Sequence, residues 1–143
     1  MSNPAFPSSQ LHDVRILMID DDKINATLAK GVLEKNGCSV EVVSNPVKGL
    51  EKYARDKEKI DLVIVDYFMP CLDGGQTVDH LRKLNPTVKV LLFSGAEEMR
   101  LRQIVRQHGI EGYLHKPLRK EEALHVIGEI LPAQPESVPQ TQP

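Results

Sequence analysis

The chain alternates between short apolar runs and segments whose apolar residues recur at helical spacing. The runs at 14–19, 62–65 and 88–93 are almost continuously apolar, which is typical of strands that helices cover on both faces. The run at 40–43, VEVV, alternates in polarity and better fits the edge of a sheet. A fifth run covers 110–114. We therefore predict strands over these ranges.

Between and after these runs, apolar side chains return every third or fourth residue, as on one face of a helix. The stripes are Ile24, Leu28 and Val32; Val47, Leu50 and Ala54; Val78, Leu81 and Leu84; Leu101, Ile104, Val105 and His108; and Leu124, Ile127 and Leu131. Asp22 is suited to cap the first helix and Gly37 to end it, and Pro46 fits a first helical turn. Strands that are each followed by a helix predict an α/β fold with a doubly wound parallel sheet.

Proline and apolar periodicity set the expected boundaries. Residues 1–11 are interpreted as a flexible arm, 12–131 as one folded domain, and the Pro/Gln-rich stretch 132–143 as a disordered tail or linker. A length of 143 residues suits a single core. The net charge of −2 does not indicate the positively charged surface that binds nucleic acid. No apolar run is long enough to span a bilayer. Cys38 and Cys71 have no metal-ligand or redox spacing, so we expect free thiols in a reducing cytoplasm.

Polar residues gather where the predicted strands end. The first strand runs into Asp20-Asp21-Asp22, the third into Asp66, the fourth into Ser94-Gly95, and the fifth into His115-Lys116-Pro117. In open α/β sheets, ligands bind beyond the carboxyl ends of the strands. Carboxylates on neighbouring ends, about 4.8 Å apart, repel one another unless a cation bridges them, and such an oxygen-rich site suits Mg²⁺. With Mg²⁺ and a lysine neutralising charge, a carboxylate at this rim can accept a phosphoryl group.

Four segments, ILMIDDDKIN, DLVIVDYFMPCLDG, VLLFSG and GYLHKP, resemble the successive signatures of the response-regulator receiver family of two-component signalling. The resemblance covers nearly the whole folded unit and implies a flavodoxin-like sheet in the order 2-1-3-4-5. It implies Asp66 as phosphoacceptor, with Asp20, Asp21, Asp66 and the backbone carbonyl of Phe68 around Mg²⁺. Ser94 matches the switch hydroxyl, Lys116 the lysine that pairs with the phosphoryl group, and Tyr113 the aromatic switch. A cis peptide bond is expected at Lys116-Pro117.

The resemblance also implies partners. A sensor histidine kinase or phosphotransfer protein would donate the phosphoryl group, and a downstream protein would bind the face formed by the fourth helix, fifth strand and fifth helix. Such a domain is not an enzyme, although it assists its own phosphorylation and dephosphorylation. Neither nucleic acid nor membrane is expected as a direct partner, and a homodimer stays open.

Two positions depart from what the family uses to tune loss of the phosphoryl group. Residue 68 is Phe and residue 96 is Ala, and neither side chain can orient an attacking water by hydrogen bonding. Our hypothesis is that the phosphorylated form is comparatively long-lived. Gln76, after Gly74-Gly75, is also less typical and leaves the start of the third helix open.

Alternative readings accompany these assignments. A phosphohydrolase of the haloacid-dehalogenase type would use Asp20, Asp22, Ser94 and Lys116. That assignment leaves Asp66 without a role, and this sequence lacks the acidic cluster which that family carries on a strand after its lysine. A degenerate receiver that serves only for docking is the other alternative. Asp22 is interpreted as an N-cap rather than a metal ligand, and Tyr113 has ordinary packing as its alternative. Arg102 and Arg106 are interpreted as a solvated helix surface, with a partner-docking face as the alternative. The five histidines are interpreted as structural or surface residues.

Overall fold

The computed structural model describes residues 11–131 and shows a five-stranded parallel sheet in the order β2-β1-β3-β4-β5. The elements are β1 (Arg15–Ile19), α1 (Lys23–Lys35), β2 (Ser39–Val43), α2 (Pro46–Asp56), η2 (Lys57–Lys59), β3 (Leu62–Asp66), α3 (Gly74–Leu84), β4 (Val90–Ser94), α4 (Glu98–His108), β5 (Gly112–His115) and α5 (Lys120–Ile130). The fold class and strand order predicted from the sequence are confirmed.

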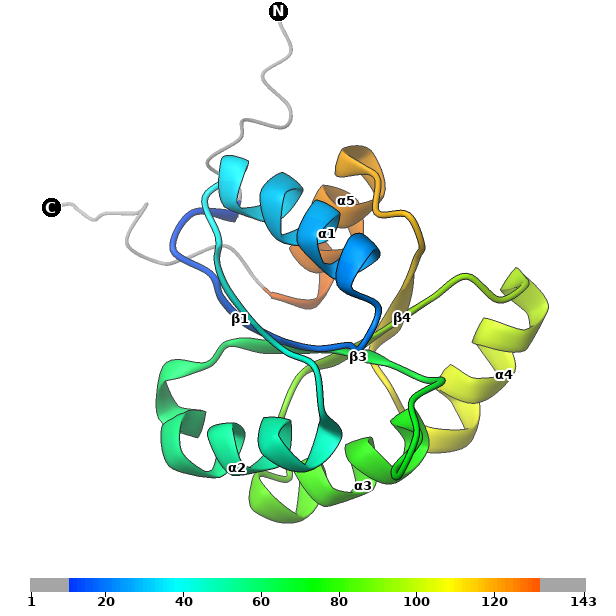
Figure 1. The fold of residues 1–143 in the computed structure, drawn as a ribbon. Helices are drawn as coiled ribbons and strands as arrows, with labels where there is room; N and C mark the ends of the chain where they lie inside the picture. Colours follow the sequence, from blue (N-terminus) through cyan, green and yellow to red (C-terminus); the bar gives the residue numbers. More distant parts are fainter. Residues whose placement is uncertain (1–10, 132–143) are drawn as a thin grey trace, which may run out of the picture.

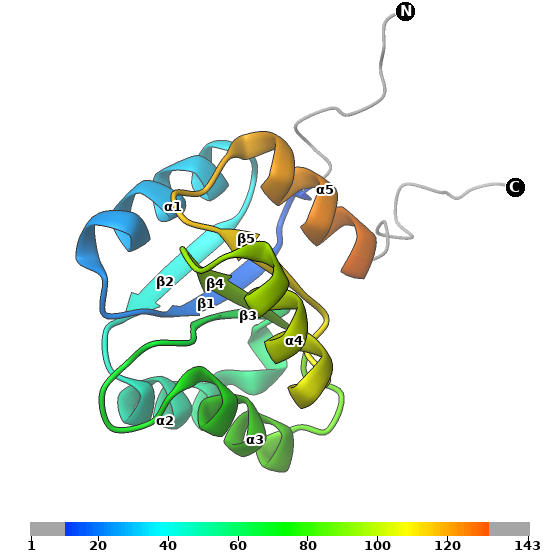
Figure 2. The same ribbon diagram turned by 90° about the vertical axis from the view of Figure 1, so that its right-hand side faces the viewer.

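The helices form two layers around the sheet. Helices α1 and α5 cover one face, while α2, α3 and α4 cover the other (Figures 1 and 2). Strands β3 and β4 are buried along their whole length, as their continuous apolar runs predicted. Strand β2 forms one edge, and its burial alternates in its first half. The core therefore consists of two apolar layers with the central strands between them.

The buried face of α1 differs from the predicted one. The side chains of Ile24 and Leu28 are 75% and 54% exposed, and the helix packs through Ala26, Ala29 and Leu33 instead. Small side chains on the packed face let a helix approach its neighbours closely, so the largest apolar residues do not always mark the buried stripe.

Helix α2 shows the same effect, and the other three helices follow the prediction. Val47 is 48% exposed, whereas Gly49 packs so closely that an added Cβ would lie 2.6 Å from the Ile19 side chain. Two predicted positions in each remaining helix are buried, namely Val78 and Leu81, Leu101 and Ile104, and Leu124 and Ile127. The other predicted positions, Leu84, Val105, His108 and Leu131, are only half-buried.

Helix ends follow the local chemistry of the sequence. The carboxylate of Asp22 accepts the backbone N–H of Asn25 at 3.1 Å and caps α1. Gly37 follows that helix with a φ of +98°, a left-handed conformation that suits glycine. The start of α3 is fixed by Asp73 and Gln76, whose side chains each accept the other's backbone N–H in a capping box. Gln76 thus defines this helix start.

The packed unit begins one residue earlier than expected. Leu11, assigned to the flexible arm, is only 1% exposed because it packs in the core formed with α1 and α5, where its carbonyl accepts the Cys38 thiol. The rest of the predicted arm and the predicted tail lie outside the described residues. Across residues 11–131, none of the helices combines the length and apolarity required of a membrane span.

Candidate functional site at the carboxyl ends of β1, β3 and β4

Strand register brings the predicted acids together. Ile19 of β1 pairs with Val65 of β3, so the next residues, Asp20 and Asp66, lie at the same edge of the sheet. Both are buried, with exposed fractions of 1% and 5%, and Asp21 beside them is exposed. One ligand oxygen of each carboxylate lies within 4.8 Å of those of the other two. The sequence therefore predicted this cluster correctly.

Burial and repulsion disturb the ionisation of Asp66. Loss of hydration and the neighbouring Asp20 charge raise the pKa of Asp66 to about 7, although Lys116 and the Phe68 N–H act in the opposite direction. That N–H donates to Oδ1 of Asp66 at 3.2 Å. A partly protonated carboxyl in a solvent-lined hollow is a mark of a functional site, because structural acids are seldom left without a full complement of counter-charges.

Lys116 supplies the counter-charge. Its Nζ lies 3.0 Å from Oδ2 of Asp20 and 3.5 Å from Oδ2 of Asp66. Burial lowers the pKa of Lys116, but the hydrogen bond and charge of Asp20, with the charge of Asp66, outweigh burial and raise it. The peptide bond to Pro117 is cis, as predicted, and the Lys116 backbone N–H donates to the Ser94 carbonyl at 2.9 Å.

The donor set fits a small divalent cation. Three carboxylates converge, and Oδ2 of the buried Asp20 faces the Lys116 ammonium without a well-directed hydrogen bond. Hard oxygen ligands with access to water are what Mg²⁺ prefers, and one ammonium does not balance the local negative charge. The acidic cluster thus agrees with the Mg²⁺ expected from the resemblance.

Ser94 lies at the same hollow. It is 2% exposed, and its Oγ accepts the backbone N–H of Ala96 at 3.1 Å. The hollow is open to solvent and is lined by Asp21, Asp22, Asn25, Asp66, Phe68, Ser94, Gly95, Lys116 and Pro117. Asp66 therefore has a path to solvent.

Tyr113 lies outside this hollow, on the α4 side of β5. Its hydroxyl donates to Oε2 of Glu98 at 3.1 Å, and Arg102 pairs with the same carboxylate at 2.5 Å. Its ring packs edge-on against His115, at 5.4 Å between centroids. Arg102 is exposed on the surface of α4, as interpreted from the sequence, and there it joins Glu98 and Tyr113 in one network.

One contact was missed by sequence reasoning. Besides capping α1, Asp22 places Oδ2 at 3.4 Å from the Lys116 ammonium. Adjacency to the acidic pair was the available signal, but the cap accounted fully for an acid at this position.

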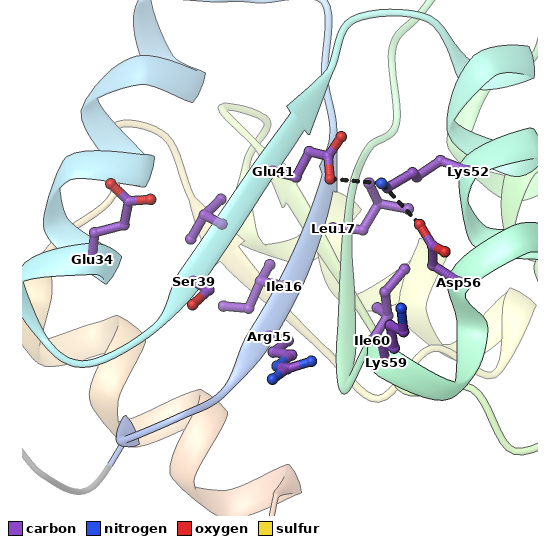
Figure 3. A pocket seen from close by; sticks show the side chains of 11 residues that line it. Arg15, Ile16, Leu17, Glu34, Ser39, Glu41, Lys52, Asp56, Lys59 and Ile60 are labelled. Atoms are coloured by element: carbon purple, nitrogen blue, oxygen red, sulfur yellow. Dashed lines mark ion pairs between the residues drawn. The ribbon is translucent and has the colours of Figure 1, made fainter.

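A second cleft lies at the sheet edge, beside β2 and the start of β1 (Figure 3). Three of its charged side chains form ion pairs, since Lys52 bridges Glu41 at 3.0 Å and Asp56 at 2.8 Å. Arg15, the first residue of β1, lines it, so the cleft is far along the strand from the acidic rim. Its paired charges give it no chemistry of the kind found at that rim.

Comparison with known proteins identifies the family of this domain. Residues 16–128 match the family described as the response regulator receiver domain. The chain belongs to this family. The receiver is 33% identical over 118 residues to the response regulator MprA of Mycobacterium leprae, covering 82% of this chain and 51% of that protein. It is 27% identical over 131 residues to the transcription factor SKN7 of Candida albicans, covering 92% of this chain and 22% of the relative.

Solved structures agree with this assignment. A response regulator receiver domain protein from Clostridium thermocellum has a TM-score of 0.74 at 28% identity, covering 81% of this chain and 92% of the other. The chemotaxis protein CheY4 of Vibrio cholerae has a TM-score of 0.72 at 23% identity, over 83% and 99% of the two chains, and supports the fold.

The receiver spans about half of the MprA length and less of SKN7. It is a domain of two-component signalling rather than an enzyme with a separate substrate, and neither the phosphohydrolase nor the docking-only alternative is favoured.

Proposed function

We propose that Asp66 accepts a phosphoryl group and that this charge switches the partner-binding surface of the receiver. The observation that carries the proposal is the convergence of Asp20, Asp21 and Asp66 around space for a cation, with the Lys116 ammonium 3.5 Å from Asp66. The donor is a histidine kinase, a phosphotransfer protein or a small acyl phosphate.

Asp20, Asp21, Asp66 and the Phe68 carbonyl would hold Mg²⁺. When bound, the ion supplies positive charge that neutralises the carboxylates and the phosphoryl oxygens. The carboxylate of Asp66 forms a bond to phosphorus while the bond from phosphorus to the donor's nitrogen or oxygen breaks, and the electron pair leaves with the donor. Lys116 and the Ser94 hydroxyl then hold the new phosphoryl oxygens. The domain thereby assists its own phosphorylation, and its later dephosphorylation returns the free carboxylate.

The output follows from Ser94 and Tyr113. Drawing the Ser94 hydroxyl toward the phosphoryl group vacates space into which Tyr113 moves, after release of its bond to Glu98. This shifts a population between two states of the α4–β5–α5 face, where a downstream protein or a second copy binds. We place the domain in the cytoplasm, and a net charge of −2 argues against direct contact with nucleic acid.

Labelling with radioactive acetyl phosphate tests the proposal. Wild-type protein incorporates label in the presence of Mg²⁺ and loses incorporation with EDTA, and Asp66→Asn abolishes it. Asp61→Asn is the matched control, because Asp61 accepts the Arg15 N–H before the start of β3, away from the hollow. Folded wild-type protein that takes up no label would remove the proposal and favour a docking role.

A further inference from the structure

Asp22 has two sets of contacts in the structure. Its carboxylate accepts the backbone N–H of Asn25 at 3.1 Å and the side-chain amide of Asn25 at 2.9 Å. Its Oδ2 also lies 3.4 Å from Nζ of Lys116. An aspartate carboxylate carries a negative charge at neutral pH. The two bonds from Asn25 hold this negative charge toward the lysine.

The helix cap alone does not require a charge. Asn45 caps α2 through a neutral amide, which accepts the Lys48 N–H at 3.0 Å. Asn and Asp are about equally good N-caps. An asparagine at position 22 would therefore keep the backbone cap of α1. It would lack the negative charge beside Lys116 and the second acceptor oxygen, which receives the Asn25 side-chain amide.

Lys116 is shared between three carboxylates. Its ammonium lies within 3.5 Å of Asp20, Asp22 and Asp66, and an ammonium has three N–H donors. Asp20 and Asp66 belong to the cluster that fits a cation, but Asp22 does not. Of the three carboxylates that contact Lys116, Asp22 is thus the one that does not also belong to the cation cluster.

We propose that Asp22 competes with the phosphoryl group for the Lys116 ammonium, so that its charge lowers the affinity of the receiver for that group. The inference rests on the proposed function and deepens it. A phosphoryl group on Asp66 must draw N–H donors of Lys116 away from Asp22, and its negative charge is repelled by the nearby carboxylate. Asp22 is therefore a positioning residue that biases the site toward its unphosphorylated state.

The affinity for beryllium trifluoride, which adds to a carboxylate as a phosphoryl group does, measures this competition in the 143-residue chain with Mg²⁺. Asp22→Asn keeps the cap and removes the charge, and it should bind the analogue about 3- to 10-fold more tightly at low salt. The difference should shrink in 1 M salt, roughly the level at which the screening length falls to about 3 Å. Asp73→Asn is the matched control, because Asp73 caps α3 in the same way but belongs to a different helix start; it should leave affinity unchanged.

A second readout needs neither cation nor analogue. The NMR signal of the Lys116 ammonium in the resting protein should shift in Asp22→Asn and stay fixed in Asp73→Asn. Equal or weaker analogue affinity in Asp22→Asn, or an unmoved lysine signal, would overturn the inference while wild-type binding upholds the proposed function. Failure of folded wild type to bind the analogue would overturn the proposed function, and this inference with it.

Discussion

The Nζ atom of Lys116 lies 3.5 Å from Oδ2 of Asp66, at the rim where the strands end. Strand β4 lies between β3 and β5 and pairs with both, so the ends of β3 and β5 lie at the same rim on either side of it. The Lys116 side chain reaches toward Asp66 past the end of β4, with its Nζ 5.2 Å from the centre of the Phe93 ring. The hydrogen bond from the Lys116 N–H to the Ser94 carbonyl, at 2.9 Å, holds the backbone that carries the ammonium. The site therefore depends on ion pairs between residues that follow or end different strands.

Replacing Lys116 by Ala should destabilise the protein. Asp20 and Asp66 would keep their buried charges without a partner, which we expect to cost about 2–4 kcal/mol in free energy of unfolding. Added Mg²⁺ should restore part of the loss, since a cation can replace the ammonium. Urea unfolding at pH 7.5 with and without Mg²⁺ measures both effects.

Lys52→Ala is the control for this change. Lys52 also pairs with two carboxylates, Glu41 and Asp56, but on the surface. The decrease in free energy of unfolding in Lys52→Ala should be smaller than in Lys116→Ala, and Mg²⁺ should not change it. Equal losses for the two variants, both unaffected by Mg²⁺, would contradict the account of Lys116.

Asp66→Asn should stabilise the Mg²⁺-free protein in a pH-dependent way. The pKa of Asp66 is raised to about 7 in the folded state, above an ordinary value of about 4. The folded protein therefore holds this proton more tightly than the unfolded chain. The contribution of Asp66 to stability is fully present below about pH 4 and is lost as the pH rises through about 7.

Removing the charge should consequently raise the free energy of unfolding by about 1–3 kcal/mol at pH 8 and by little at pH 4. Denaturant titrations at the two pH values provide the measurement. Asp79→Asn, on the exposed side of α3, should show no such difference. A stabilisation by Asp66→Asn that is the same at both pH values would show that charge repulsion is not its cause.

The two cysteines should differ in reactivity. Burial raises the pKa of the Cys38 thiol to about 11, whereas Cys71 is exposed. At pH 8 only about one Cys38 thiol in a thousand is ionised, and the thiolate is the reactive form. A thiol reagent should modify one cysteine rapidly in native protein and the second only after denaturation. In Cys71→Ser the rapid phase should vanish; its persistence would mean that Cys38 is accessible.

Phe68 should prolong the life of the phosphorylated form. Its ring is 53% exposed at the hollow and lies between Tyr67, at 5.0 Å, and the Arg100 guanidinium, at 5.9 Å. An apolar ring cannot orient a water toward phosphorus. Phe68→Asn should shorten the half-life about 3- to 10-fold, because an amide can orient the attacking water by hydrogen bonding, whereas Phe68→Leu should not. Release of phosphate after loading measures this, and equal half-lives in all three proteins would exclude the hypothesis.

The sequence predicted the strands and their polar ends because those signals are local. Asp20, Asp66, Ser94 and Lys116 each follow a recognisable apolar run, and topology alone then brings them together. The contact between Asp22 and Lys116 was missed because it depends on side-chain direction across 94 residues of sequence. From the sequence alone, an aspartate that caps a helix cannot be distinguished from one that also pairs with a distant lysine.

The prediction of which face of α1 is buried was wrong for a related reason. Ile24 and Leu28 have helical spacing, but the helix is rotated so that Ala26 and Ala29 face the sheet. Periodicity gives the period of a helix and only weakly its phase, especially where small residues allow close packing. Leu11 was likewise assigned to an arm because a single apolar residue carries no periodic signal.

The position of the phosphoryl group tests the central claim most directly. Protein labelled with acetyl phosphate and Mg²⁺ can be reduced with borohydride, which marks an acyl phosphate, and then mapped by peptide mass spectrometry. The account predicts the modification at Asp66, in a form that hydroxylamine removes. A label mapped to another residue, or a phosphate ester on a hydroxyl that hydroxylamine leaves intact, would contradict it.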